Sequence, residues 1–302
     1  MIRLLAILLL LALPAAATAA DRLDPAPRIA VMSAFAPEWQ VLKAATSDRK
    51  SHSVNGIDFV TGRLAGRNVV LFLSGISMVN ATMSTQVALD RFDVTGIVFS
   101  GIAGGVDPAL HVGDVVAASH WSQYLEATFG RDLGNGHYEL PPWRQTTMPN
   151  YGMIFPAPVE VRRAGAAPDH KLWFDTDPGM LAAAGKIGDV GLRDCVKPGQ
   201  CLDHKPRLLV GGNGVSGQAF VDNAAFREYV FATFKAQVLD MESAAVAMVS
   251  YANGVPFIAF RSLSDLAGGG PDANEMGTFM GLASENSARV VERFLQAWTP
   301  PR

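Results

Sequence analysis

The segment AQVLDMESAAVAMVSYANGVPFIAFRSLSD, residues 236–265, contains the alternation of elements that decides the fold. Two short apolar runs, AQVLD and PFIAFRSLSD, have the length and composition of buried strands. The stretch between them, MESAAVAMVSYANG, has the length of a helix. Strands interleaved with helices in this way are typical of α/β proteins with a largely parallel sheet.

Two carboxylates, Asp240 and Glu242, stand where the first of these strands passes into the helix. Helix capping is one explanation, because Asp240 can cap the first turn and Glu242 lies near the positive end of the helix dipole. Ligand binding is the other, because strands of an open α/β sheet end at the crevice where ligands bind. Taken alone, these two residues leave both explanations open.

The same alternation extends along the rest of the chain. Residues 59–75 read as a hairpin that turns near Ala65 and Gly66. Further strand patterns occur at residues 28–34, 96–105, 112–119 and 207–212, and helix patterns at residues 37–45, 79–92, 177–188, from about 223, and 274–298. We therefore predict a three-layer α/β fold, in which helices flank a central mixed, mostly parallel sheet on both faces.

Residues from about 120 to 206 interrupt this alternation. They are rich in Pro, Gly and aromatic residues and have weak periodicity. Long irregular segments in a compact domain are usually functional lids or insertions. We expect one domain over residues 21–302, with an insertion at about 120–206.

The composition limits the possible partners and the compartment. The 302 residues are 49% hydrophobic and 18% charged, with a formal net charge of −3 and no basic block, which argues against a nucleic-acid partner. Residues 1–20 combine one Arg, an apolar run too short to span a bilayer comfortably, and a small-residue tail, as in a secretory signal peptide. We expect a periplasmic or secreted protein without membrane attachment after cleavage.

The two cysteines, Cys195 and Cys201, fit an exported protein. They flank a Lys-Pro-Gly turn, and we predict that they form a disulfide that closes a short loop. Two cysteines and six scattered histidines lack the spacing of a metal site. We expect neither a metal nor a cofactor.

Four predicted strands end in small or charged residues. These ends carry Glu38, the glycine-rich turn Gly101–Gly105, the pair Asp240 and Glu242, and the pair Arg261 and Asp265. Because parallel strands end at one edge of a sheet, we expect the four ends to converge on one crevice. Singly, Glu38 and Asp265 are also consistent with an exposed first-turn acid and a cap, so their convergence is what favours a site.

These segments resemble the nucleoside phosphorylase/nucleosidase superfamily, and within it the 5'-methylthioadenosine/S-adenosylhomocysteine nucleosidases. The resemblance lies in SAFAPEWQVL (33–42), SGISMVNATMSTQVALDRF (74–92), SGIAGGVDPALHVGDVV (100–116) and residues 239–265. There is also a likeness to plant bark and vegetative storage proteins of the same fold, in SGIAGG, FVDNAAFREYVFATF (220–234) and SDLAGGG (264–270).

The resemblance implies roles for two catalytic acids. Cleavage of a purine nucleoside requires a proton for the leaving base and a nucleophile on the opposite face of the sugar. Asp265 matches the acid that protonates or hydrogen-bonds purine N7, and Glu38 matches the carboxylate that activates the attacking water.

Further residues match the substrate-binding positions of the family. Glu242 would accept hydrogen bonds from the ribose hydroxyls, for which a carboxylate is well suited. Arg261 would orient the acids or pair with Glu242. The remaining matches are Met241 against the sugar, Phe220 stacked on the base, the Val221 backbone at the purine edge, and Gly104 in the glycine-rich turn. Met241 and Phe220 are residue types that are also common in cores.

The sequence departs from the nucleosidase pattern at Ile102. The family usually has Ser in this turn, and that residue helps to hold the water or phosphate nucleophile. An Ile side chain cannot hydrogen-bond, so we expect a nucleophile that is less well held, which puts turnover in doubt. The storage-like proteins share the GIAGG turn. The insertion is a second departure, which would cover or reshape the pocket for the 5' substituent.

Hydrolysis is favoured over phosphorolysis by the residues around Glu38. Phosphate sites need fixed cationic donors, and SAFAPEWQ contains none. Repulsion between Glu38 and a phosphate at about 3–4 Å would cost on the order of 4 kcal/mol at an effective dielectric of 20. We therefore expect an exported purine nucleosidase, a homodimer by family likeness, that acts on adenosine-type nucleosides. The alternatives are a non-catalytic nucleoside-binding or storage protein and a phosphate-dependent phosphorylase.

Overall fold

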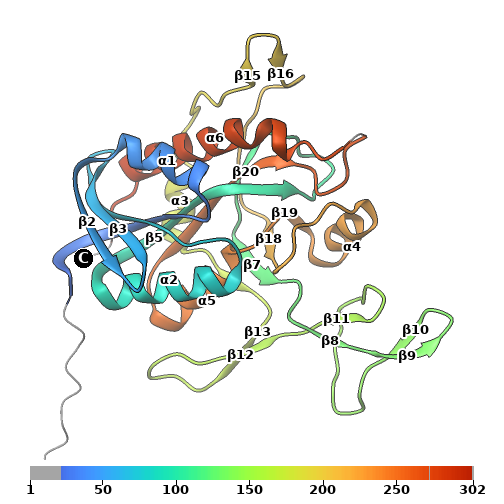
Figure 1. The fold of residues 1–302 in the computed structure, drawn as a ribbon. Helices are drawn as coiled ribbons and strands as arrows, with labels where there is room; N and C mark the ends of the chain where they lie inside the picture. Colours follow the sequence, from blue (N-terminus) through green and yellow to red (C-terminus); the bar gives the residue numbers. More distant parts are fainter. Residues whose placement is uncertain (1–21, 272, 301–302) are drawn as a thin grey trace, which may run out of the picture.

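The strand β1 (Asp24–Ser33) lies inside a twelve-stranded sheet in the computed structural model, which describes residues 22–271 and 273–300 (Figure 1). The expected signal peptide, residues 1–20, lies outside the described residues. The other strands of this sheet are β2 (Ser47–Val54), β3 (Ile57–Leu64), β4 (Arg67–Leu73), β5 (Phe92–Gly105), β6 (Val115–Ala117), β7 (His120–Gln123), β14 (Phe174–Asp175), β17 (Leu208–Val210), β18 (Asn213–Ser216), β19 (Ala236–Asp240) and β20 (Phe257–Asp265).

The sheet is mixed, and its central strands run parallel. Nine strands follow the order β14-β7-β18-β19-β5-β1-β4-β3-β2, while β20 pairs with β5 and β6, and β6 pairs with β17. The strand β5 has β1 and β20 as parallel neighbours and β19 as an antiparallel one. Antiparallel pairing is also found at the hairpin β3–β4 that the sequence predicts.

Helices cover both faces of the sheet. They are α1 (Ala36–Ala45), α2 (Met78–Arg91), α3 (Pro178–Ala184), α4 (Ala224–Phe234), α5 (Ser243–Asn253) and α6 (Met276–Ala297). One face packs against α2 and α5, and the other against α1, α3 and α6, as Figure 1 shows. A smaller apolar cluster lies under α4. The predicted three-layer α/β fold is confirmed.

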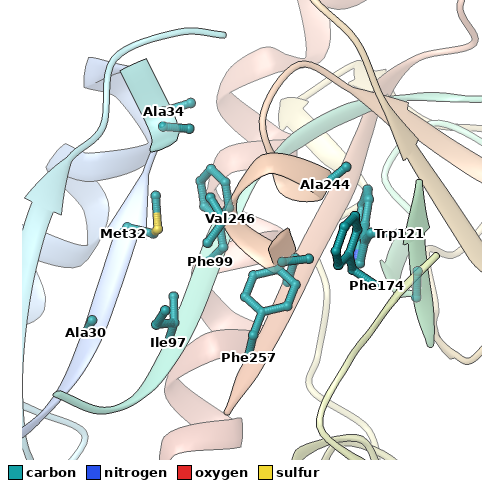
Figure 2. Close-up of a cluster of buried hydrophobic side chains, with 14 of the residues drawn as sticks. Ala30, Met32, Ala34, Ile97, Phe99, Trp121, Phe174, Ala244, Val246 and Phe257 are labelled. Carbon is teal, nitrogen blue, oxygen red and sulfur yellow. The ribbon is translucent and has the colours of Figure 1, made fainter. Parts of the chain in front are cut away.

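The central strands are continuous apolar runs because their side chains point in turn to the two faces of the sheet, and both faces are covered. In β1, Met32 points into the layer of α2 and α5, whereas Val31 points into the layer of α1 and α6. In β5, Phe99 likewise points into the layer of α2 and α5, and Val98 into the layer of α1 and α6. A strand covered on both faces needs apolar residues at every position. Figure 2 shows one of these layers, with Met32, Ile97 and Phe99 close to Val246 of α5.

The range expected as an insertion contributes two strands to the central sheet. The strand β7 pairs with β18, and β14 pairs with β7. The rest of the range contains two-stranded hairpins, most of which project from the sheet in Figure 1. Their strands are β8 (Ala127–Phe129) with β11 (Ile154–Pro156), β9 (Arg131–Gly134) with β10 (His137–Glu139), β12 (Val159–Val161) with β13 (Asp169–Lys171), and β15 (Cys195–Lys197) with β16 (Gln200–Cys201).

Two features depart from the sequence pattern. The polar stretch of β2 forms an edge strand that pairs with β3, which its composition does not indicate. In α2, Val79 and Met83 are exposed, although they continue the apolar spacing that ends at the buried Phe92. Within the described residues, no helix has the length and apolarity needed to cross a membrane.

We predict that Gly214→Ala lowers stability. Gly214 of β18 lies opposite the buried Trp121 of β7, and an added Cβ would be 2.5 Å from the indole ring. Overpacking of this kind typically costs about 1–3 kcal/mol. Gly281→Ala in α6 is the matched control, because its Cβ meets no atom within 4 Å and the change is expected to stabilise the helix by up to about 1 kcal/mol. Urea unfolding measures both, and equal midpoints would contradict the packing described for β7 and β18.

Candidate active site

The carboxyl ends of β1, β5, β19 and β20 meet at an open pocket. The predicted site residues that line it are Glu38, Gly104, Phe220, Val221, Met241, Glu242 and Asp265. The structure thus brings together the strand ends that the sequence singles out, and Arg261 is fully buried next to them.

Glu38 is held at the pocket by backbone donors. It sits in the first turn of α1, where Oε2 accepts hydrogen bonds from the N–H groups of Ala34 (2.8 Å) and Phe35 (3.3 Å). Oε1 accepts the N–H of Ile102 (2.9 Å) from the glycine-rich turn. Burial raises the pKa of the Glu38 carboxyl, while Arg261 and the three N–H donors act in the opposite direction. The backbone of Ile102 therefore fixes Glu38, although its side chain cannot.

The glycine-rich turn allows Arg261 and Glu38 to approach each other. A Cβ on Gly101 would lie 2.0 Å from Arg261 Nη1 and 2.9 Å from Glu38 Oε1. Gly104 lies beside the acid at the end of β20, since a Cβ there would be 3.2 Å from Asp265 Oδ1. Close approach of side chains to the main chain, rather than a phosphate-binding motif, explains these glycines.

Arg261 pairs with two acids. Its Nε lies 2.7 Å from Asp240 Oδ2, and its Nη2 lies 3.4 Å from Glu242 Oε2. The guanidinium also packs over the ring of Phe99, at 3.9 Å from the centroid. Asp240 in addition accepts the N–H groups of Glu242 (3.2 Å) and Ser243 (3.1 Å). Asp240 therefore both caps the start of α5 and forms the shorter of the two ion pairs.

Glu242 is a buried carboxylate that faces the pocket. Its Oε1 accepts the N–H of Ser77 (2.8 Å), at the start of α2. Burial is the largest cause that raises the pKa of Glu242 to about 7, and the neighbouring Asp240 raises it further, while Arg261 lowers it. Ser77 holds an unusual backbone conformation, with φ 81° and ψ 161°, a region that residues other than glycine rarely adopt.

Asp265 ends β20 at the other side of the glycine-rich turn. Its Oδ1 accepts the N–H of Ala267 (2.8 Å), and its Oδ2 accepts the hydroxyl of Ser264 (2.9 Å). The side chain is buried, and burial raises the pKa of its carboxyl against the effect of these hydrogen bonds. A carboxyl with a raised pKa in a pocket is suited to proton transfer.

The remaining predicted residues differ in exposure. Phe220 is 57% exposed at the pocket, so it is not a core residue, whereas Val221 is buried. Met241 is half-buried and lines the pocket. The pocket also has large apolar lining residues that were not predicted as site residues, among them Phe35, Ile76 and Met276. Phe35 and Ile76 lie within segments that carry the family resemblance, whereas Met276 opens a helix whose start carries no such signal.

The predicted disulfide between Cys195 and Cys201 is present and joins the hairpin β15–β16. This hairpin is anchored on α6 by Arg193, whose backbone N–H and carbonyl both pair with the buried Asn286. Among the residues that the structure describes, no three His, Cys, Asp or Glu side chains are arranged to hold a metal ion.

Fold and pocket together define an α/β protein with a pocket lined by buried carboxylates at the strand ends. A model of the phosphorylase superfamily matches residues 28–296, and the chain belongs to this superfamily. The membership expected from the sequence is confirmed.

Similar proteins lie mainly in one branch. The chain is 30% identical to the 5'-methylthioadenosine/S-adenosylhomocysteine nucleosidase of Marinomonas sp. (strain MWYL1), over 89% of this chain and 98% of the relative. It is 26% identical to bark storage protein A of Populus deltoides, over 86% and 84%. The crystal structure of such a nucleosidase from Colwellia psychrerythraea 34H, in complex with adenine, has a TM-score of 0.67 at 27% identity and covers 89% of this chain and 95% of its own. The expected enzyme class, an N-glycosyl hydrolase, agrees with these nucleosidases.

We predict that Glu242 makes stability depend on pH. Its pKa is about 7 in the folded state against 4.5 for an unperturbed glutamate. Glu242 therefore destabilises the folded state progressively as the pH rises through that window, and fully above it. Glu242→Gln removes this effect. As the pH rises from below 4.5 to above 7, the free energy of unfolding of the variant should therefore increase relative to that of the wild type by on the order of 3 kcal/mol.

Urea unfolding at several pH values measures this difference. Glu228→Gln on the exposed face of α4 is the matched control, and its free energy of unfolding should change with pH as that of the wild type does. A free-energy difference between Glu242→Gln and the wild type that is the same at every pH would contradict the role given to burial.

Proposed function

We propose that the protein is an exported nucleosidase that hydrolyses the N-glycosidic bond of adenosine-type nucleosides, with methylthioadenosine and S-adenosylhomocysteine as the leading candidates. One observation carries this proposal: Glu38, Glu242 and Asp265 are all buried and line one pocket. The similarity to nucleosidases over nearly their full length supports the substrate class.

Asp265 supplies the proton for the leaving base. Breaking the bond between C1' and N9 leaves negative charge on the purine, which protonation at N7 neutralises. Burial raises the pKa of Asp265 and so favours the neutral form that can donate a proton at N7. Phe220 is exposed at the pocket and is available to stack on the base, while the Val221 backbone meets its edge.

Glu242 and Glu38 act on the sugar and on the water. Glu242 accepts hydrogen bonds from the ribose hydroxyls, with Met241 against the ring. Three N–H donors occupy three of the roughly four acceptor positions of Glu38, and the remaining one can orient a water molecule. Water attacks C1', its proton passes to Glu38, and the C1'–N9 electrons leave with the protonated base.

A phosphorylase is the less favoured alternative. None of the described residues that line the pocket is Lys or Arg. Arg261 is buried and already paired with Asp240 and Glu242. A phosphate dianion would therefore meet carboxylates without a free cation to bind it.

A non-catalytic binding or storage protein is the alternative from another class, and the likeness to bark storage protein A favours it. The buried, backbone-anchored Glu38 favours catalysis, because a binding protein has no need of a water-activating acid. Incubating the protein with methylthioadenosine, S-adenosylhomocysteine, adenosine and inosine, with and without phosphate, separates the three. Free base without phosphate supports the nucleosidase, base only with phosphate the phosphorylase, and ligand binding without release of base the storage protein.

Two further features belong to the proposal. Export rests on residues 1–20, and N-terminal sequencing of the mature protein should begin near Ala20 or Asp21; retention of Met1 would contradict it. A homodimer is supported by exposed apolar side chains beside the pocket, at Ile76 and along α2 at Val79 and Met83. Light scattering should give twice the chain mass, and Val79→Glu should shift it toward the monomer. A wild-type monomer at high concentration would contradict the dimer.

We predict that Asp265→Asn and Glu38→Gln each lower kcat for methylthioadenosine by roughly 10²–10⁴-fold. Each change keeps the size of the side chain but removes the proton donor or the base. Asp58→Asn on the surface of β3 is the control and should leave kcat unchanged. If either site variant retained wild-type turnover, its assigned role would be wrong.

A further inference from the structure

We propose that Asn274 is a positioning residue that holds the acid Asp265 and links it to Asp222 in the loop that carries Phe220 and Val221. The inference rests on the proposed function, because it takes Asp265 as the proton donor. Asn274 lies just before α6, outside the motifs that carry the family resemblance.

The amide of Asn274 has a defined orientation. Its Oδ1 accepts the N–H of Met276 (2.9 Å) in the first turn of α6, so its Nδ2 points the other way. Nδ2 donates to Asp222 Oδ1 (3.1 Å) and Asp265 Oδ1 (3.4 Å). An amide nitrogen carries two hydrogens, and each of these two carboxylates takes one.

These contacts decide which oxygen of Asp265 carries the proton. Oδ1 accepts two N–H donors, from Ala267 and Asn274, and an oxygen in that position is a poor site for a proton. Among the described residues, the hydrogen-bond partner of Oδ2 is the hydroxyl of Ser264, which can accept as well as donate. The proton is thereby confined to Oδ2, where it is available to the purine.

Asp222 adds an electrostatic effect to this positioning. Its negative charge raises the pKa of Asp265, whereas the hydrogen bond from Asn274 lowers it. Other charged groups on the surrounding elements are Glu38 and Glu242, which line the same pocket, and Arg227 of α4, which reaches Gly269. Asn274 thus contacts both carboxylates, and its hydrogen bond and the charge of Asp222 act in opposite directions on the pKa of Asp265.

Two near-isosteric variants test the inference. Asn274→Asp keeps an oxygen to accept the Met276 N–H but loses both donors and adds a negative charge. Asp222→Asn keeps an oxygen to accept from Asn274 but loses its charge. The pH profile of kcat/KM for methylthioadenosine should fall as the pH rises and Asp265 loses its proton. We expect this limb to move up in pH by a few tenths of a unit or more in Asn274→Asp and down in Asp222→Asn.

The magnitude of kcat provides a second readout. Asn274→Asp should lower kcat by up to about 100-fold, because the proton is no longer confined to Oδ2. KM should change much less, and Asp58→Asn should alter neither quantity. A purely structural role would lower the rate without moving the two limbs in opposite directions, and unchanged limbs in both variants would overturn the inference.

Calorimetric titration of adenine over the same pH range gives a readout that needs no turnover. A protonated Asp265 donates to N7, so the affinity for adenine should fall as the pH rises through the pKa of Asp265. The midpoint should shift in opposite directions in the two variants. If the wild type releases no base but these shifts occur, the proposed hydrolysis fails while the role of Asn274 stands. If the wild type hydrolyses nucleosides but no shift occurs, only the role of Asn274 fails.

Discussion

The burial of Arg261 among carboxylates is the interaction on which the rest of the site depends. Its guanidinium is fully buried and pairs with Asp240 at 2.7 Å and Glu242 at 3.4 Å, close to Glu38. A buried charge without a partner is strongly destabilising. Three buried acids, two of them at the end of β19, are tolerable here because one cation lies among them. The same arrangement leaves Arg261 unavailable for a phosphate.

Backbone N–H groups position the carboxylates of Glu38 and Glu242. Glu38 is held by N–H groups of the connection between β1 and α1 and of the glycine-rich turn, and Glu242 by the N–H of Ser77. Such donors cannot be removed by substituting a single side chain. Ile102 therefore keeps its part in holding Glu38 despite its apolar side chain, and only the water itself loses a side-chain partner at that position.

The sequence predicts the fold and the convergence of the site well, because both depend on regular features. Apolar strands buried on both faces are easily recognised, and the parallel strands β1, β5 and β20 bring Glu38 and Asp265 to one edge. Glu242 joins them from the end of β19, which runs antiparallel to β5. The features that the sequence does not predict depend on irregular backbone or on pairing between distant segments. Asn274 reaches Asp265 through a loop without periodicity, and β7 joins the central sheet from within a Pro- and Gly-rich stretch.

Isotope labelling tests the central claim, water attack within a carboxylate pocket, most directly. The protein would be incubated with methylthioadenosine in ¹⁸O-labelled water without phosphate, and the released sugar analysed promptly by mass spectrometry, with a correction for exchange of the free sugar. The account predicts free adenine and one ¹⁸O atom at C1' of the methylthioribose. An unlabelled sugar, or intact methylthioadenosine after prolonged incubation, would contradict it.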